Sequence, residues 1–338
     1  MRLAIDIGGT FTDIVLENQH QLLTKKVLTS IAQPEVAVID GISDLLNENN
    51  INSSEIKMII HGTTLATNAI IERKGAKTCF ITTEGFRDVL DIGYESRFDQ
   101  YDILIEKTMS LVPRKYRYVI EERTDVNGNQ IKPINTTKFK KIIEKIKTEN
   151  FESIGIGFLH SYANSKNENV LKKYILENLP GVEVSISSDV CPEIREYERF
   201  TTTVINAYIK PLMSNYLKKL DYELKEKGFN CPLLLMTSGG TLTNVSSACK
   251  NPVRLVESGP AGGAILATSI AKDLNLNKVI SFDMGGTTAK ITIIEDKKAI
   301  KAREFEVDRK ARFKKGSGFP LRIPVIEMVE IGAGGGSI

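Results

Sequence analysis

The stretch AIDIGGTFTD, residues 4–13, sets an acid inside an apolar run and follows it with a turn of two glycines. The stretch ISFDMGGTTAK, residues 280–290, repeats this order of apolar strand, acid, paired glycines and threonines. Asp6 and Asp283 are the acids that precede the two glycine turns. One such turn is common in plain hairpins, whereas two copies in one chain indicate a shared purpose.

A turn with two glycines has a specific chemical use. Because no Cβ stands in the way, its backbone N–H groups can approach an anion closely. Threonine hydroxyls add donors without adding charge. An aspartate would repel a phosphate held there unless the aspartate also holds Mg²⁺, because the cation binds carboxylate and phosphate oxygens at the same time. The pattern therefore predicts two phosphate-binding turns, each with an acid that holds Mg²⁺ directly or through water, and two unrelated tight hairpins are the disfavoured alternative.

The length, net charge and residue composition of the chain limit the classes of function that it can have. A chain of 338 residues can bury a large core and predicts two domains, or three. A net charge of +3 does not favour nucleic acid as a partner, and three histidines leave little room for a multi-histidine metal site. Four cysteines without a CxxC pair fit a reducing cytosol, and no apolar run approaches the roughly 18 residues of a membrane span. We expect a cytoplasmic protein without a signal peptide or a membrane partner.

The hydrophobic pattern predicts an α/β fold. Three short strands joined by tight turns come first, followed by a helix that begins near Pro34, a strand, a helix that closes at Gly75 and another strand. The predicted strands of this part are residues 2–8, 13–17, 21–28, 57–60 and 78–83. A small α/β insert is expected over about 84–190, and a long helix interrupted near Pro211 follows it.

The duplicated turns resemble those of the superfamily of acetate kinase, sugar kinases, actin and heat-shock ATPases. The resemblance implies an actin-like ATPase fold with duplicated ribonuclease H-like lobes, each of which offers one glycine hairpin to the phosphates of ATP. It implies a first lobe over residues 1–277, including the insert, and a second lobe over 278–338 that is incomplete. The helix SGPAGGAILATSIA, residues 258–271, resembles the helix that connects the lobes.

The superfamily resemblance also assigns roles to individual residues. Asp6 and Asp283 become the metal ligands and two of the catalytic residues. The residues assigned to the phosphates of the cofactor are Gly8, Gly9, Thr10, Phe11, Thr12, Gly285, Gly286, Thr287 and Thr288. The implied cofactors are ATP and Mg²⁺.

Longer blocks narrow the resemblance to one family. The chain resembles the hydantoinase A/5-oxoprolinase family from Arg2 to Ile338, in the blocks DIGGTFTD, HGTTLATNAIIERKGAKTCFITTEGFRDVLDIG, EIREYERFTTTVINAYIKP, ESGPAGGA, FDMGGTTAK and RFKKGSGFPLRIPVIEMVEIGAGGGSI. It departs from the family at Gly239, where an Asn-Gly-Gly turn is usual after serine, and at Ser165 and Asn167, where Pro and His are frequent. These departures leave the glycine turns intact and leave the substrate open.

The family resemblance implies ATP-dependent ring opening of a cyclic amide such as a hydantoin or 5-oxoproline, together with a B-type subunit or domain. Transfer of the γ-phosphoryl group to the amide oxygen would turn that oxygen into a leaving group and let water attack the ring carbon. Such transfer needs positioning and charge neutralisation more than a protein nucleophile. The alternatives are the phosphorylating subunit of an ATP-dependent ketone carboxylase and a non-catalytic actin-like ATP-binding module.

A few side chains outside the turns are candidates as well. His61 ends a strand ahead of two helix-capping threonines, where a catalytic role and a structural hydrogen bond are both open. Arg195 and Arg199 flank two glutamates at the start of a helix, where an exposed ion-paired turn is favoured over a contact with substrate or phosphate. His20 and His160 are not expected to act.

The end of the chain carries a further expectation. Family members continue far beyond GAGGGSI, so we expect the second lobe to be cut off within this chain. Residues 1–275 should then form the compact body, while the strands in VISFDM and RIPVIEMVEI should lie uncovered on at least one face. Only the phosphate side of the nucleotide site would be complete, which predicts weak ATP affinity and no activity for the 338 residues alone.

Overall fold

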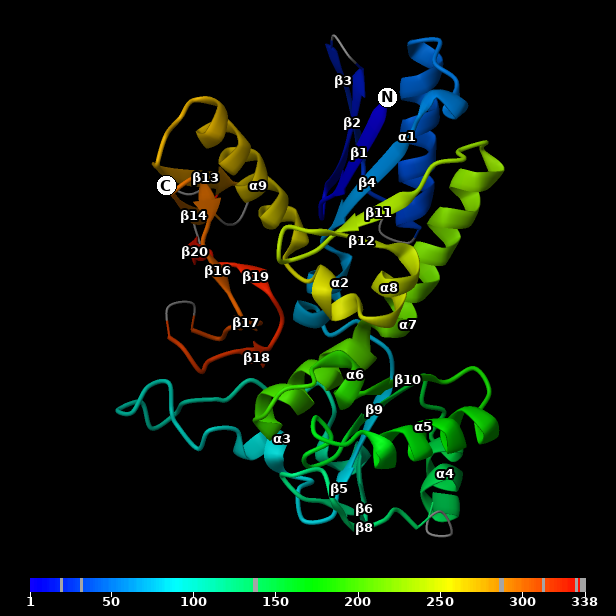
Figure 1. The fold of residues 1–338 in the computed structure, drawn as a ribbon, viewed down its shortest axis with the longest axis vertical. Helices are drawn as coiled ribbons and strands as arrows, with labels where there is room; N and C mark the ends of the chain where they lie inside the picture. The colour runs from blue at the N-terminus through cyan, green and yellow to red at the C-terminus, as the bar shows by residue number, and fades with distance from the viewer. Residues whose placement is uncertain are drawn as a thin grey trace. The chain divides into compact units, whose positions relative to one another are not determined.

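The computed structural model describes residues 1–18, 21–30, 33–135, 139–285, 289–311, 314–331 and 334 (Figure 1). The chain divides into two compact units, and each is built from separated segments. The first comprises Met1–Asn68, Met213–Arg303 and the chain from Pro324 onward, and the second comprises Ala69–Leu212 and Glu304–Ile323. These units are not the two lobes proposed from the sequence, and the boundary at residue 277 stays a prediction.

The first unit contains a six-stranded mixed sheet with the order β12-β11-β4-β1-β2-β3. Its strands are β1 (Arg2–Ile7), β2 (Phe11–Asn18), β3 (Gln21–Leu28), β4 (Met58–Thr63), β11 (Leu233–Met236) and β12 (Leu242–Asn244). The first three strands form an antiparallel meander, while β4 and β11 run parallel to β1. All five strands predicted in the first 83 residues are confirmed within a few residues.

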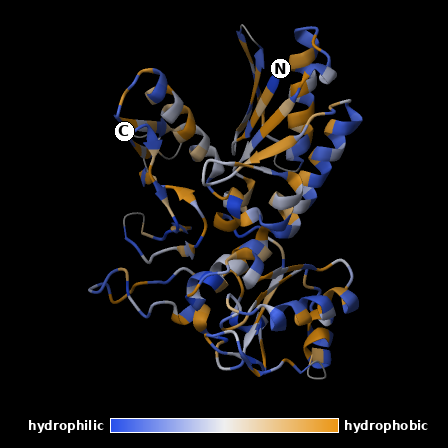
Figure 2. Cartoon of the chain, viewed as in Figure 1, coloured by the Kyte–Doolittle hydropathy of each residue, from blue (hydrophilic) through white to orange (hydrophobic). Residues whose placement is uncertain are grey.

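The two faces of this sheet differ. Along β1 the residues Leu3, Ile5 and Ile7 are buried, and the alternate positions, including Asp6, are exposed. Helix α1 (Pro34–Glu48) packs on β2 and β3. Figure 2 shows hydrophobic residues along β4 and β11, which lie inside the sheet. Asp6 therefore ends a central strand on the face opposite the apolar core.

The long helix α7 (Glu196–Glu226) contains Pro211 and runs through it as one helix. The predicted interruption is wrong. Proline at this position removes the hydrogen bond to the carbonyl of Ala207, but the helix is packed on both sides of it, since Ile209 and Met213 are fully buried. The packing of these apolar side chains holds the helix together across the missing bond.

The first unit continues beyond its main sheet. Helix α8 (Val245–Lys250) and the short turn Pro252–Leu255 lead into helix α9 (Ser258–Asp273), which contacts β4 and β11. A smaller sheet follows, built from β13 (Lys278–Met284), β14 (Ala289–Glu295), β15 (Lys298–Ala299) and β20 (Val329–Ile331), and α9 also packs on β13 and β14. Strands β16 (Lys301–Ala302) and β19 (Val325–Ile326) form a separate pair.

The exposure expected for the two last apolar segments is found along the whole of the first and in part of the second. Ile280, Phe282 and Met284 alternate along β13 and are 70%, 55% and 45% exposed, as predicted for VISFDM. In RIPVIEMVEI, by contrast, Val325 and Ile326 are buried, because β19 pairs with β16 and Ile326 packs against α9. Val329 in β20, near the end of the same segment, is 52% exposed, so the prediction is wrong for β19 and is confirmed for β20.

The second unit contains a parallel sheet with the order β10-β9-β5-β6. The strands are β5 (Thr78–Thr83), β6 (Arg117–Ile120), β9 (Ser153–Gly157) and β10 (Glu183–Ile186). Helices α4 (Phe139–Thr148) and α5 (Lys166–Asn178) join them, with buried apolar residues from both helices in the core. The remaining short elements of the chain are α2 (Leu65–Ile71), α3 (Val89–Ile92), α6 (Ser187–Val190), β7 (Arg123–Thr124), β8 (Gln130–Lys132), β17 (Phe305–Val307), β18 (Phe319–Leu321) and the turns Ser53–Glu55 and Arg114–Tyr116.

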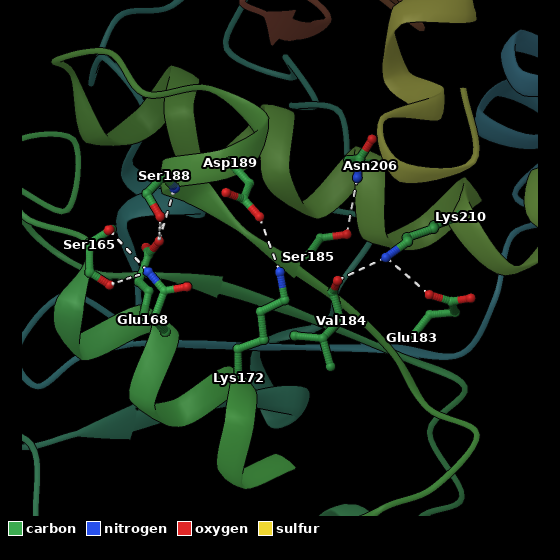
Figure 3. A network of polar contacts seen from close by, with 11 residues as sticks. Ser165, Glu168, Lys172, Glu183, Val184, Ser185, Ser188, Asp189, Asn206 and Lys210 are labelled. Atoms are coloured by element: carbon green, nitrogen blue, oxygen red, sulfur yellow. Dashed lines mark hydrogen bonds and ion pairs between the residues drawn. The ribbon is translucent and has the colours of Figure 1, made fainter. Parts of the chain in front are cut away.

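A buried carboxylate ties the second unit together (Figure 3). Glu168 of α5 is fully buried and accepts hydrogen bonds from the Phe158 N–H at 3.0 Å and from Ser187 Oγ at 2.7 Å. It also accepts bonds from both the N–H and the hydroxyl of Ser188, at 2.9 and 2.6 Å. Four donors therefore share one carboxylate, which fixes α5 to the ends of β9 and β10.

Among the described residues, no helix is long and apolar enough to cross a membrane.

Candidate functional site

The first glycine turn is a tight hairpin. The N–H of Gly8 donates to the carbonyl of Phe11 at 2.9 Å, and a Cβ on Gly8 would lie only 3.0 Å from that same oxygen. Thr12 is fully buried, and its hydroxyl lies 3.0 Å from the hydroxyl of Thr29, which donates to the carbonyl of Gly8. Thr12 therefore shapes the turn, while Gly9 and Thr10 are exposed at its tip.

Asp6 precedes this turn, and glycines on two neighbouring segments leave space around its carboxylate. It is the register partner of Gly62 on β4, and a Cβ on Gly62 would lie 3.0 Å from Asp6 Oδ1. The first turn of α9 approaches from another direction, since a Cβ on Gly259 would lie 3.8 Å from the same oxygen. The carboxylate thus occupies space that a side chain on β4 would fill.

The pKa of Asp6 reflects the burial and the charges around its carboxylate. Partial desolvation raises the pKa of Asp6, and the negative charges of Asp13 and Asp283 raise it further, while Lys26 lowers it. The residue is nevertheless exposed overall, so its carboxylate is shielded on some sides and open on others. Lys26 is engaged with Asp13 at 2.6 Å. Asp283, the acid of the second turn, is therefore among the charges that act on Asp6.

The second turn is described in part. Asp283 lies on β13 in register with Lys290 on β14, and Gly285 is exposed. Three residues assigned to the phosphates lie outside the described part of the chain, namely Gly286, Thr287 and Thr288.

Two charged residues beside the turns were missed by the sequence reasoning. Lys290 is hydrogen-bonded to Glu257, which precedes α9 and has a left-handed backbone with φ 62° and ψ 31°. Both stand inside family blocks, ESGPAGGA and FDMGGTTAK. Only their contact in space singles them out.

His61 is not brought together with the two acids. It is the register partner of Ile5 and lies on the buried face of the sheet, opposite the face of Asp6. Its Nε2 lies 2.8 Å from the hydroxyl of Tyr216, and its Nδ1 lies 3.3 Å from the carbonyl of Ile5. Burial lowers the pKa of His61 to about 4, so the ring is neutral. This geometry favours the structural alternative, and a catalytic role for His61 stays a prediction.

The arginines behave differently from the expectation. Arg199 is fully buried in the second unit and donates to the carbonyls of Glu193 at 2.8 Å and Phe158 at 3.1 Å. The expected exposed ion pair is therefore wrong for Arg199. Arg195 is exposed, with a φ of 79°. The ring of His160 lies 3.3 Å from the hydroxyl of Tyr162, and His20 lies outside the described residues.

The residues at the two turns fit a magnesium ion. No group of three or more His, Cys, Asp or Glu side chains that could hold a metal occurs in the described part of the chain. Mg²⁺ does not need one, because it usually keeps several waters and binds one or two carboxylates plus substrate phosphates. Asp6 and Asp283 supply two hard oxygen ligands whose mutual repulsion a cation would relieve.

The fold and the turns define a class: an α/β protein that gathers two acidic glycine hairpins, from two different sheets, in one compact unit. The chain belongs to the hydantoinase/oxoprolinase family. The family's N-terminal region matches residues 2–179, and its hydantoinase/oxoprolinase region matches residues 199–338. The family resemblance noted in the sequence is thereby confirmed.

Relatives extend the comparison. An uncharacterised protein of Methanocaldococcus jannaschii is 44% identical over the whole chain, which covers 50% of that protein. The caprolactamase subunit alpha of Pseudomonas jessenii is 30% identical over the whole chain, which covers 48% of that subunit. The chain thus spans about half the length of the curated relatives it matches.

Solved structures agree on the fold. The crystal structure of the ATP-dependent caprolactamase from Pseudomonas jessenii matches with a TM-score of 0.86 and 28% identity, over 99% of this chain and 48% of that one. Nucleotide-free acetone carboxylase, which carries out ATP-dependent acetone carboxylation, matches with a TM-score of 0.84 and 24% identity, over 98% of this chain and 48% of that one. At that identity the second likeness shows the fold alone.

Proposed function

We propose that this chain is the ATP-binding and phosphoryl-transferring part of an enzyme that opens a cyclic amide. The observation that carries the proposal is that the charge of Asp283 acts on Asp6, although the two acids belong to different sheets and each precedes a glycine turn of the same kind. The family membership and the ATP-dependent caprolactamase structure support the use of ATP. The relatives named 5-oxoprolinase and caprolactamase support a cyclic amide as the substrate class, in which we include hydantoins, 5-oxoproline and larger lactams.

We further propose that the two sheets of the first unit begin the two lobes of an actin-like ATPase fold, the second being incomplete in this chain. The support is the repeated order of apolar strand, acid and glycine turn on β1–β2 and on β13–β14, with α9 packed on strands of both sheets. A B-type subunit and a cytoplasmic location belong to the same proposal.

The residues have distinct tasks in this mechanism. Asp6 and Asp283 would hold Mg²⁺, which when bound neutralises phosphate charge. The exposed turn residues Gly9 and Thr10 would orient the phosphates, and Thr12 keeps the turn closed from within. The bond from the γ-phosphorus to the amide oxygen forms while its bond to the β,γ-bridging oxygen breaks, and ADP leaves with that electron pair. One water then attacks the activated ring carbon, and the carbon–nitrogen bond breaks with its electron pair on the nitrogen, which takes up a proton. The acyl phosphate that remains is cleaved by a second water, which gives the carboxylate and phosphate.

The test uses the complete subunit together with its partner. Asp6→Asn and Asp283→Asn should each lower Mg-ATP turnover about 10²-fold or more, since each removes a metal-facing charge and keeps the side-chain shape. Asp296→Asn is the matched control, because Asp296 is an exposed acid at the turn after β14 with a φ of 48°, which asparagine tolerates. Near-normal turnover in both site variants would refute the proposal.

The substrate class is tested with a panel. Hydantoins, 5-oxoproline, other lactams, and acetone with bicarbonate are each incubated with Mg-ATP and the complex, and ADP release is measured. ADP release coupled only to ketone carboxylation would replace the cyclic amide by the carboxylase alternative. Nucleotide binding without turnover on any substrate would favour a non-catalytic module.

A further inference from the structure

A partly buried ion pair lies beside the two acidic turns. Lys290 is in register with Asp283 across β13 and β14, and its ammonium donates to the carboxylate of Glu257. The two side chains are only 18% and 19% exposed. An exposed ion pair needs no special explanation, because such pairs contribute little. A pair that is mostly removed from water carries a desolvation penalty, so its position calls for a reason.

The backbone around Glu257 is held in place by neighbouring polar groups. Its left-handed conformation is uncommon for a residue with a Cβ. The N–H of Glu257 donates to Thr67 Oγ1 at 3.0 Å, and the hydroxyl of Ser258 donates to the carbonyl of Thr63 at 3.2 Å. Backbone strain that the surroundings enforce is typical of functional sites.

The same segment meets the catalytic face of the main sheet. Gly259 follows Glu257 by two residues, and its missing Cβ would lie 3.8 Å from Asp6 Oδ1. Asp283, the strand neighbour of Lys290, raises the pKa of Asp6. Lys26 also acts on Asp6, but its ammonium is bound to Asp13 and more than half of its side chain is exposed. Lys290 is thus a largely buried cation placed among the acids of the site.

We propose that Lys290 binds the transferring phosphoryl group and that Glu257 is the positioning residue that aims it. This inference rests on the proposed ATP-dependent function. An ammonium has three N–H donors, of which Glu257 accepts one, and the others can donate to phosphoryl oxygens. Negative charge spreads over those oxygens as the γ-phosphoryl group moves from ADP to the acceptor oxygen. Lys290 keeps its protons throughout and stabilises that charge electrostatically.

The proposal predicts selective effects on the γ-phosphoryl position. In the full-length subunit with its partner, Lys290→Gln should weaken binding of ADP with beryllium fluoride, a γ-phosphoryl mimic, about tenfold or more, and leave binding of ADP alone within about threefold. Its kcat for ATP should fall about 10²-fold with KM nearly unchanged. Lys290→Arg should recover part of the loss, and Glu257→Gln should lower kcat about tenfold. Lys278→Gln, an exposed lysine on β13, is the matched control.

Isothermal titration calorimetry with the two nucleotide forms separates the outcomes. If Lys290→Gln and Lys278→Gln both retain wild-type affinity for ADP with beryllium fluoride, the role of Lys290 is refuted and the ATP-dependent function stands. If the wild-type complex binds neither form, both proposals are refuted. Glu257→Gln keeps the shape of the ion pair, so a selective loss in that variant supports the proposal even where Lys290→Gln does not fold.

Discussion

Replacing Gly62 with alanine should disturb the position of the Asp6 carboxylate while leaving the stability of the first unit almost unchanged. The new Cβ would lie 3.0 Å from Asp6 Oδ1, whereas ordinary contacts begin near about 3.5 Å, so the oxygen must move by roughly half an ångström. The obstructing atom is the end of a side chain, so the carboxylate can rotate away without a shift of the sheet. Gly62 lacks a positive φ, and alanine there should change the free energy of unfolding by no more than about 1 kcal/mol.

The functional effect should be larger. A misplacement of about 1 Å at a reacting site can lower the rate about 10²-fold, so half of that predicts roughly a tenfold loss in kcat. Steady-state ATP hydrolysis by the complete complex measures the loss, and urea unfolding of the same variant measures stability. Gly259→Ala is the control, because its Cβ would lie 3.8 Å from the same oxygen, an ordinary contact. Equal kcat values for the two variants would show that the position of Asp6 does not matter.

Three further substitutions test the interactions of buried residues within each of the two units. The folded-state pKa of His61 is about 4, below its ordinary 6.5, so the neutral ring stabilises the fold fully above pH 6.5. This stabilisation is lost as the pH falls toward 4, by up to about 3 kcal/mol. Urea unfolding at pH 7 and at about pH 4.5 should show the loss, and His61→Gln should reduce it. Gly157→Ala would place a Cβ 2.5 Å from the ring of Phe200 and should destabilise by about 2 kcal/mol or more in thermal unfolding, while Gly262→Ala, with open space around it, should not. Glu168→Ala would leave four donors without their acceptor and should cost about 3 kcal/mol or more, and a loss below 1 kcal/mol by urea titration would contradict that account.

The local elements were predictable because their signals are local. Alternating apolar residues marked β1 and β2, and Pro34 marked the first turn of α1. The continuity of α7 was not predictable, because proline is a local helix breaker, and the packing that overrides it involves distant residues. Arg199 shows the same limit, since its acceptors are backbone carbonyls, which no side-chain pattern reveals.

The candidate site was predictable in part. Asp6 and Asp283 stood out because each combines an acid with a glycine turn, and in the structure the charge of Asp283 acts on Asp6. Glu257 and Lys290 did not stand out, because they lie 33 residues apart and neither belongs to a repeated pattern. Segment 304–323 likewise belongs to the second unit only through contacts between residues far apart in the chain. Charge pairs and unit boundaries of this kind are properties of the tertiary fold.

The charges around Asp6 oppose folding and are better understood as a feature for binding. Asp6 faces Asp13 directly across β1 and β2, and like charges in that arrangement destabilise a sheet. Asp283 adds to the repulsion, and the two charges together raise the pKa of Asp6 beyond the increase that desolvation, the largest cause, already produces. An asparagine at one of these positions would remove the conflict without a change in shape. A ligand that brings positive charge to the acids would relieve the same conflict, and because it would bind the folded state alone, it would stabilise that state. The arrangement therefore favours a cation at the acids with an anionic partner at the glycine turns, as the proposed binding of Mg-ATP requires.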